Sequence, residues 1–408
     1  MNIRLHAESF KPNKTIVLSG SKSETNRMFL LQALFPEIKI ENISNSDDSL
    51  AMEKALKFPS DIVDVHHAGT AMRFLTAFFA TQENREVVFT GSSRMQERPI
   101  HILVDALRSL GADIQYENKE GFPPLKIKGK KLQSNKIAIP ANISSQYISA
   151  LLLIAPKLEN GLSLELIGEQ TSLPYIKMTL ALLNEIGIET TFVGNRIKVY
   201  PKQKVKTKTV TVESDWSSAS YFFELIAFSE VGTSLKIQKL KSDSLQADRA
   251  VVEIFEQFGV ETEFLPNNEI QITKVNTNYP TEIRLNLIEC PDIAQTIAVT
   301  CFGLGIQAHL TGLHTLKIKE TDRLVALKNE LEKFGATVEI TNDSLSLHKR
   351  NLQTLLPVNV LVKTYQDHRM AMAFAPLGLF TPIEIENAEV VSKSYPKYWE
   401  DVFSLFLS

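Results

Sequence analysis

Six almost wholly apolar segments of the chain each begin with polar residues. They are SKSETNRMFLLQALF, HAGTAMRFLTAFFA, SSQYISALLLIAP, SSASYFFELIAF, PDIAQTIAVTCFGLG and DHRMAMAFAPLGL. A helix that is apolar on all sides is buried inside a domain, so the pattern predicts six internal helices. Their polar first residues should stand at helix N-termini, where free N–H groups and the helix dipole attract anions.

A second series of segments alternates with the first. Four of them combine an amphipathic helix, a glycine and two short strands: LVDALRSLGADIQYENKEGFPPLKI, LALLNEIGIETTFVGNRIKVY, VEIFEQFGVETEFLPNNEIQI and LKNELEKFGATVEITNDSLSL. The glycines Gly111, Gly187, Gly259 and Gly335 recur roughly every 75 residues, and such a period indicates an internal repeat. Glycine directly after a helix accepts the left-handed conformation that ends it. We therefore expect six repeats of strand, buried helix, strand, outer helix, strand, strand.

The repeats also predict how the chain divides into domains. The sixth repeat ends with YPKYWEDVFSLFL and leaves no chain for its last strands, so we expect a strand around Asn2–Glu8 to supply one. The first residues then fold with the C-terminal half. We predict a three-repeat α/β domain over residues 14–207 and a second over residues 1–13 plus 208–408, joined by two crossovers. Two domains joined by two strands form a hinge, which favours closure over a ligand.

Composition narrows the class of protein. The 408 residues are 44% hydrophobic and carry a formal net charge of −3, which argues against nucleic acid and membrane surfaces as partners. The two cysteines, Cys290 and Cys301, lie in an apolar region and are expected to be buried thiols, in keeping with a cytoplasmic protein. The first residues form no apolar leader, and no apolar run approaches about 18 residues, so neither export nor membrane spanning is expected.

Several cations lie at or near the predicted helix starts. They are Lys22, Arg27, Arg73, Arg98, Lys319, Arg323, Arg369 and Lys393. A solvated surface charge is the ordinary alternative for any one of them. Arg73 and Arg369, however, stand in otherwise apolar helices, where an unpaired charge is costly to bury. These two arginines require an anionic partner or a wet cleft.

Hydroxyl, amide and carboxylate groups accompany the cations. The runs Ser144-Ser145-Gln146 and Ser217-Ser218 begin two further helices, and they either cap those helices or donate to phosphate oxygens. Asp292 and Glu320 either carry protons or form simple ion pairs. Nucleotide and zinc motifs such as GxxxxGK[ST], GxGxxG after a strand, HExxH and CxxC do not occur. The pattern therefore favours a metal-free site for substrates with several phosphate or carboxylate charges.

The quoted motifs resemble those of one family over nearly the whole chain. GSKSETNR, AGTAMRFL, RMQERPI, SSQYISALLL, DWSSASYF, PDIAQT, KETDRL and DHRMAMAF are similar, in the same order, to segments of the enolpyruvyl transferases, and specifically of the branch that acts on shikimate 3-phosphate. KETDR together with DHRMAM is the most specific part. The resemblance implies a two-domain, inverse α/β barrel-like fold of six βαβαββ repeats, three per domain, with the active site in the interdomain cleft.

The resemblance also implies an activity. Enolpyruvyl would pass from phosphoenolpyruvate to the 5-hydroxyl of shikimate 3-phosphate by addition and elimination, with release of phosphate and without cofactor or metal. This is a step toward chorismate and the aromatic amino acids. The implied partners are these two small molecules alone, bound by a cytoplasmic monomer that has no nucleic acid or membrane partner.

Site residues follow from the resemblance, position by position. Those implied for shikimate 3-phosphate are Lys22, Ser23, Arg27, Ser144, Ser145, Gln146, Ser172, Asp292 and Lys319. Those implied for phosphoenolpyruvate are Lys22, Gly69, Arg98, Gln146, Arg323, Arg369 and Lys393. Asp292 is the expected base toward the 5-hydroxyl, and Glu320 with Lys22 are the expected proton carriers to the methylene carbon and the leaving phosphate. How these roles divide between addition and elimination stays open.

Two positions depart from the family pattern, and two other functions compete. His67 stands where Asn is common before AGT, and Thr315 stands where many members carry Asn. Gly69 favours sensitivity to glyphosate, which occupies the phosphoenolpyruvate site in this family. One competing function is enolpyruvyl transfer to UDP-N-acetylglucosamine, whose enzyme has a loop cysteine that TGSSRMQERPIH lacks. The other is non-catalytic anion binding on the same scaffold, which the acids among the cations disfavour.

Overall fold

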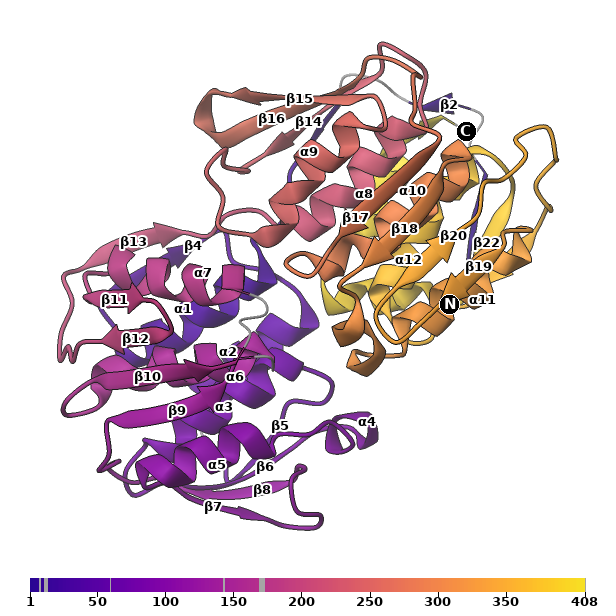
Figure 1. The fold of residues 1–408 in the computed structure, drawn as a ribbon. Coiled ribbons are helices and arrows are strands. Elements are labelled where there is room, and N and C mark those ends of the chain that lie inside the picture. The colour runs from indigo at the N-terminus through magenta and orange to yellow at the C-terminus, as the bar shows by residue number, and fades with distance from the viewer. Residues whose placement is uncertain (7–8, 11–13, 59, 142–143, 169–172, 408) are drawn as a thin grey trace. The chain divides into compact units, whose positions relative to one another are not determined.

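The computed structural model describes residues 1–6, 9–10, 14–58, 60–141, 144–168 and 173–407 (Figure 1). The chain divides into two compact units. Met1–Ser19 and Glu213–Ser408 form one, which we call the discontinuous unit, and Gly20–Val212 forms the other, the continuous unit. Each unit encloses its own hydrophobic core.

The two crossovers lie a few residues beyond the expected boundaries at 13/14 and 207/208. Strand β3 (Lys14–Ile16) pairs in parallel with β14 (Ser234–Gln238), so it belongs to the discontinuous unit. Strand β13 (Lys208–Thr211) pairs in parallel with β4 (Ile38–Glu41), so it belongs to the continuous unit. Each crossover strand is therefore hydrogen-bonded within the unit that the chain is about to leave.

Two sheets of the continuous unit share one topology, a parallel pair extended by an antiparallel hairpin. Their strand orders are β5-β6-β8-β7 and β11-β12-β10-β9. The strands are β5 (Ile62–Asp64), β6 (Glu86–Thr90), β7 (Asp113–Tyr116), β8 (Leu125–Lys128), β9 (Lys136–Pro140), β10 (Leu162–Ile167), β11 (Thr190–Val193) and β12 (Arg196–Val199). The third sheet is the pair β13-β4. It gains no hairpin, because only residues 58–61 separate its outer helix from β5.

The discontinuous unit repeats this topology. Its four-stranded sheets have the orders β15-β16-β14-β3 and β17-β18-β20-β19, and β1-β22-β21 forms a three-stranded sheet. The remaining strands are β1 (Ile3–Leu5), β15 (Val260–Leu265), β16 (Glu269–Lys274), β17 (Glu282–Asn286), β18 (Gln307–Thr311), β19 (Val338–Ile340), β20 (Leu345–Leu347), β21 (Val360–Val362) and β22 (Ile383–Ile385), with the pair β2 (Ser9–Phe10) and β23 (Phe406–Leu407) beside them.

The N-terminal strand completes the sixth repeat, as the sequence predicts. Strand β1 pairs antiparallel with β22, with Ile3 opposite Ile385, and Figure 1 shows it in indigo among the orange and yellow strands. The α/β class and the six repeats, three in each unit, are confirmed. The first and sixth repeats are the incomplete ones.

The six apolar segments form the inner helices. They are α1 (Lys22–Leu34), α3 (Gly69–Ala80), α6 (Ser145–Ile154), α8 (Trp216–Ala227), α10 (Ala294–Leu304) and α12 (His368–Phe374). Every residue of α3, α10 and α12 is buried, which confirms the expectation for a helix that is apolar all round. Short 3-10 turns precede α10 and follow α6 and α12: η4 (Pro291–Ile293), η1 (Ala155–Lys157) and η6 (Ala375–Leu379).

The outer helices bury one face only. They are α2 (Asp47–Lys57), α5 (His101–Leu110), α7 (Leu173–Glu185), α9 (Val251–Glu256) with η2 (Ala247–Ala250), α11 (Arg323–Lys333) and α13 (Tyr398–Leu405). Short helical turns stand between the repeat elements: α4 (Ser93–Gln96), η3 (Pro266–Asn268), η5 (His314–Ile318) and η7 (Ala388–Lys393). Among the described residues, no helix is both long and apolar enough to cross a membrane.

The repeat glycines end their helices in the predicted way. Gly111, Gly187, Gly259 and Gly335 have φ of 108°, 84°, 72° and 87°. A Cβ on Gly187 or Gly335 would meet nothing within 4 Å, so at these two sites the backbone conformation, and not lack of space, favours glycine. Both cysteines are buried free thiols, as expected. Burial raises the pKa of the Cys290 thiol to about 12.

Candidate active site

In the discontinuous unit, Arg323 gathers three carboxylates. It is the first residue of α11, and its side chain is 2% exposed. Its NH1 lies 2.9 Å from Asp292 Oδ1, its NH2 2.8 Å from Glu320 Oε2, and its Nε 2.7 Å from Asp367 Oδ2. Burial alone would lower the pKa of this guanidinium, but Asp367, Glu320 and Asp292 hold it above its ordinary value. Arg323 is therefore a fixed positive charge.

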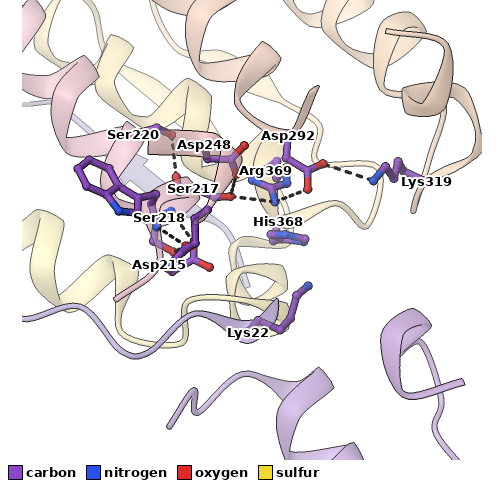
Figure 2. Close-up of polar contacts among 12 residues, drawn as sticks. Lys22, Asp215, Ser217, Ser218, Ser220, Asp248, Asp292, Lys319, His368 and Arg369 are labelled. Atoms are coloured by element: carbon purple, nitrogen blue, oxygen red, sulfur yellow. Dashed lines mark hydrogen bonds and ion pairs between the residues drawn. The ribbon is translucent and has the colours of Figure 1, made fainter. Parts of the chain in front are cut away.

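Asp292, in η4, is surrounded by cations. Besides Arg323, its carboxylate lies 3.1 Å from Arg369 NH2 and 3.5 Å from Lys319 Nζ, as Figure 2 shows for the last two. Burial opposes ionisation, yet Arg369, Lys319 and Arg323 together hold the pKa of Asp292 far below its usual range. The structure thus brings five of the predicted residues into one ion-pair network: Asp292, Lys319, Glu320, Arg323 and Arg369.

Arg369 is placed by the start of α12. The Asp367 carboxylate caps this helix by accepting from the Arg369 N–H at 2.9 Å, while its other oxygen holds Arg323. The Arg369 Nε is buried and has no hydrogen-bond partner among the described residues. Asp292 is thus the anionic partner that Arg369 requires in its apolar helix.

Ser217 and Ser218 lie in the first turn of α8 but do not cap it. Asp215 is the cap, accepting from the Ser218 N–H at 2.8 Å and from the Ser218 hydroxyl at 3.0 Å. The Ser217 hydroxyl instead donates to Asp248 and accepts from Arg369 NH2 at 3.4 Å. In this unit Lys393 stands apart from the network: its Nζ donates to the Gln366 carbonyl at 2.7 Å.

In the continuous unit, Lys22 is the first residue of α1. The motif SGSKSETNR forms the predicted loop and helix start, with Ser21 at the N-cap position and without a capping side-chain bond. Lys22 Nζ lies 3.6 Å from Asp48 Oδ2 in the first turn of α2. The unusual His67 approaches the carboxylates in the same turn, with its Nε2 3.8 Å from Asp47 Oδ2 and 3.9 Å from Asp48 Oδ1.

Arg27 is buried among neutral oxygens. Its Nε donates to Thr179 Oγ1 at 2.8 Å, its NH2 to Ser149 Oγ at 3.0 Å, and its NH1 to the Ser23 carbonyl at 2.7 Å. Burial lowers the pKa of this guanidinium to about 10. These bonds tie α1 to α6 and α7, so Arg27 has a structural function in this unit.

Arg98 lies directly against Gly69, the first residue of α3. A Cβ added at Gly69 would approach Arg98 NH1 to 2.7 Å, so the glycine makes room for the guanidinium. The neighbouring Arg73 is 4% exposed and donates to neutral atoms, the Gly69 and Pro99 carbonyls and the Met95 sulfur. Burial, together with the Arg98 charge, lowers the pKa of Arg73 to about 10. Neutral acceptors thus contact Arg73 in place of the anionic partner or wet cleft that the sequence led us to expect.

The start of α6 lies near that of α3. Ser144 is the N-cap and accepts from the Gln146 N–H at 3.4 Å, which supports the capping alternative for this residue. The Gln146 side chain donates to Thr70 Oγ1 at 3.2 Å, and Ser145 is buried. Ser172 lies outside the described residues.

Sequence reasoning missed Asp367 and Asp248 as parts of the network. Asp367 could have been found from its place as the cap before HRMAM, but nothing near Asp248 in the sequence indicates that it lies behind Arg369. Thr315, the second unusual position, has a buried hydroxyl oxygen with no partner among the described residues. The described residues contain no group of three or more His, Cys, Asp or Glu side chains that could bind a metal ion.

Sequence comparisons find proteins of known family that are similar to this chain. A family model described as EPSP synthase (3-phosphoshikimate 1-carboxyvinyltransferase) matches residues 55–402. A 3-phosphoshikimate 1-carboxyvinyltransferase from Bacteroides fragilis is 44% identical over 392 residues, covering 95% of this chain and 94% of its own. One from Haemophilus influenzae is 35% identical over 425 residues, covering 95% of each chain.

Solved structures agree in fold. An EPSP synthase from Acinetobacter baumannii superposes with a TM-score of 0.80 at 22% identity, covering 100% of this chain and 98% of its own. The enolpyruvyl transferase NikO from Streptomyces tendae superposes with a TM-score of 0.72 at 12% identity, covering 98% of this chain and 96% of its own. At such identities the likeness supports the fold and not the roles of single residues.

Proposed function

This chain belongs to the EPSP synthase (3-phosphoshikimate 1-carboxyvinyltransferase) family, and we propose that it transfers the enolpyruvyl group of phosphoenolpyruvate to the 5-hydroxyl of shikimate 3-phosphate, releasing phosphate. It is a transferase of aromatic amino acid biosynthesis. Transfer to UDP-N-acetylglucosamine is not favoured, because the relatives are named for the shikimate reaction and the loop that would need a cysteine has none, both cysteines being buried residues of the discontinuous unit.

The observation that carries our assignment of roles is Asp292 among Arg323, Arg369 and Lys319. Its carboxylate is ionised at neutral pH and able to accept a proton, but three cations make it a weak base. Anionic substrates compete for these cations when they bind, so binding raises the proton affinity of Asp292. We therefore assign Asp292 as the base toward the 5-hydroxyl, active only once both substrates are present.

The transfer requires two steps with opposite proton movements. In the addition, the 5-oxygen bonds to C2 of phosphoenolpyruvate, loses its proton to the base, and C3 gains a proton to become a methyl group. In the elimination, the C2–O bond to phosphate breaks and the methyl group returns a proton. We assign Lys22 and Glu320 as the carriers of these protons. Lys22 is assigned to both substrates, Glu320 lies 2.8 Å from Arg323 of the phosphoenolpyruvate set, and neither side chain is fully buried.

The remaining assigned residues hold the two anions. For phosphoenolpyruvate we propose Lys22, Gly69, Arg98, Gln146, Arg323, Arg369 and Lys393. For shikimate 3-phosphate we propose Lys22, Ser23, Arg27, Ser144, Ser145, Gln146, Ser172, Asp292 and Lys319. Guanidinium forks suit carboxylate and phosphate. Both sets of residues draw on both units, so turnover needs the complete chain.

We also propose that the enzyme is a cytoplasmic monomer whose only partners are its small-molecule substrates. Its net charge of −3 supports the absence of nucleic acid and acidic membrane partners. The free thiols Cys290 and Cys301 are in keeping with a reducing compartment. Light scattering on a gel-filtration column tests the monomer, and a mass of about 46 kDa is expected from the 45.8 kDa chain.

Phosphate release from phosphoenolpyruvate tests the function. We expect release with shikimate 3-phosphate and none with UDP-N-acetylglucosamine. Asp292→Asn should bind shikimate 3-phosphate, measured by calorimetry, yet turn over about 10² to 10⁴ times more slowly, because it has lost the base. The control is Glu289→Gln, which removes an exposed carboxylate three positions away and should leave the rate unchanged.

Two results would contradict the proposal. If the native enzyme released no phosphate with shikimate 3-phosphate, the proposed activity itself would be rejected. Near-normal turnover of Asp292→Asn would reject Asp292 as the base while leaving the activity in place.

A further inference from the structure

A further buried carboxylate, that of Asp248, is linked to Arg369 through the hydroxyl of one serine. Asp248 lies in η2, is 5% exposed, and accepts a hydrogen bond from the Ser217 hydroxyl. The same hydroxyl oxygen accepts from Arg369 NH2 at 3.4 Å, and that nitrogen also lies 3.1 Å from Asp292 Oδ2. Figure 2 shows the resulting chain of contacts from Asp248 through Ser217 to Arg369 and Asp292.

The chain of contacts has a direction because a hydroxyl carries only one proton. While Asp248 is ionised, it accepts the hydrogen bond from the Ser217 O–H, and the hydroxyl oxygen then turns its lone pairs toward Arg369. Arg369 NH2 is thereby held by two acceptors from different elements, Ser217 at the start of α8 and Asp292 in η4. The Nε of Arg369 is buried and has no hydrogen-bond partner among the described residues.

The turn that carries Asp248 is itself fixed to α8. Gln246, just before η2, accepts from the Trp216 N–H at 3.0 Å and donates to the Ser214 carbonyl at 2.8 Å. Its own N–H donates to Ser244 Oγ at 3.1 Å. Asp248 is thus presented to Ser217 by a rigid support.

We propose that Asp248 is a positioning residue for the transfer reaction: through the Ser217 hydroxyl it fixes the orientation of the Arg369 guanidinium that receives phosphoenolpyruvate. This inference rests on the proposed function, which assigns Arg369 to that substrate. Asp248 itself touches no substrate in this scheme. Its effect reaches phosphoenolpyruvate only through Ser217 and Arg369.

The charge state of Asp248 gives the proposal a pH signature. The charged and titratable groups around it are Asp292 and Cys290 near η4, Arg369 on α12 and Asp215 at the start of α8. Burial and the Asp292 charge raise the pKa of Asp248 to about 7, against the opposing effect of Arg369. Below that pH Asp248 becomes protonated and is a weaker acceptor for the Ser217 hydroxyl. Ser217 then no longer fixes the orientation of Arg369.

Two variants separate the relay from a general structural effect. Asp248→Asn keeps an acceptor for Ser217 but removes the charge, and Ser217→Ala removes the relay. Each should raise KM for phosphoenolpyruvate about tenfold at pH 8, the scale of one hydrogen bond to a charged group, with kcat and KM for shikimate 3-phosphate little changed. Ser217→Thr retains the hydroxyl and should restore the native KM. Asp243→Asn, an exposed neighbour, is the control.

The decisive readout is the ratio of variant to native KM for phosphoenolpyruvate as a function of pH. Titration of the substrate cancels in this ratio. It should be largest at pH 8 and fall toward one near pH 6, where native Asp248 is protonated and the variants have nothing further to lose. A loss of stability alone would lower the active fraction, and hence kcat, at every pH.

Every outcome bears on the proposal. Native KM values in both variants, or a ratio that does not change with pH, would overturn it while phosphate release by the native enzyme continued to support the function. An equal rise in KM for shikimate 3-phosphate would also overturn it. Native enzyme that neither binds phosphoenolpyruvate by calorimetry nor releases phosphate would overturn both the function and the inference.

Discussion

At position 69 the missing side chain makes room for a guanidinium. Arg98 NH1, NH2 and Cζ would lie 2.7, 3.1 and 3.2 Å from a Cβ placed there. All three atoms belong to the end of a flexible side chain. The chain would therefore tolerate alanine by moving Arg98, and the cost would fall on whatever Arg98 binds.

We expect Gly69→Ala to raise KM for phosphoenolpyruvate by about tenfold, because a displaced guanidinium loses one charge-assisted hydrogen bond. Inhibition by glyphosate should weaken in parallel if the inhibitor uses the same guanidinium, whereas KM for shikimate 3-phosphate and the melting temperature should change little. Steady-state kinetics with each substrate varied in turn, with and without glyphosate, measure this.

A double-variant cycle is the control for that mechanism. If the methyl group acts by displacing Arg98, then Gly69→Ala should add nothing in an Arg98→Ala background. Additive effects of the two substitutions would show that alanine blocks the substrate directly, and would reject displacement of Arg98 as the cause.

The positions of the cations could be predicted from the sequence, but their hydrogen-bond partners could not. The cations at helix starts were predictable, because Lys22 and Arg369 stand at the polar beginnings of apolar runs. The partners were not: Arg323 meets Asp367 across 44 positions and Arg27 meets Thr179 across 152. Such pairs depend on how the repeats pack, and no local pattern records them.

At the scale of the elements, a glycine follows several outer helices, and substitution of Gly335 after α11 tests why glycine is found there. Gly335 ends α11 with φ of 87°, and a Cβ there would meet no atom within 4 Å. Replacement therefore costs only the left-handed conformation. We expect Gly335→Ala to lower the free energy of unfolding by about 1 kcal/mol, and Gly335→Asn by less, because asparagine tolerates that conformation better.

Denaturant unfolding with unchanged m-values measures these differences. Val325→Ala on the exposed face of the same helix is the control, with an expected change within about 0.5 kcal/mol. Equal losses for Ala and Asn would contradict a conformational cause, because a steric or solvation effect would not distinguish the two in this way.

The order of elements along the chain was largely predictable. Which sheet the strands β1, β3 and β13 would join was predictable only in part. Periodicity identified the buried helices and the glycine stops, and the shortage of chain after the sixth outer helix predicted the pairing of β1. The places of β3 and β13 were not predicted to the residue, since a strand of three or four residues carries no mark of the sheet that it will join. The short connection at residues 58–61 also shows that the first repeat lacks the hairpin we expected.

At the scale of the whole molecule, the two units differ in their dependence on distant chain. The continuous unit, Gly20–Val212, is one uninterrupted segment with its own core, and every sheet described in it pairs strands of that segment. The discontinuous unit needs residues 1–19, because β3 lines the edge of one of its sheets and β1 the edge of another.

This asymmetry predicts that residues 20–212 fold alone. The isolated segment should unfold in one cooperative transition and show dispersed amide resonances, because it loses no strand partner and no part of its core. It should not release phosphate from phosphoenolpyruvate, since Asp292, Glu320 and Arg369 are absent from it. The matched segment, residues 213–408 without 1–19, should unfold at a lower temperature or fail to fold.

Adding a peptide of residues 1–19 to the second segment makes the test sharper. The peptide restores β1 and β3, so it should raise the melting temperature of residues 213–408 and leave that of residues 20–212 unchanged. A cooperative transition in 213–408 that ignores the peptide would mean that the N-terminal strands contribute nothing to that unit. Failure of 20–212 to fold would mean that its stability depends on the rest of the chain, although its core and all its described strand pairs are its own.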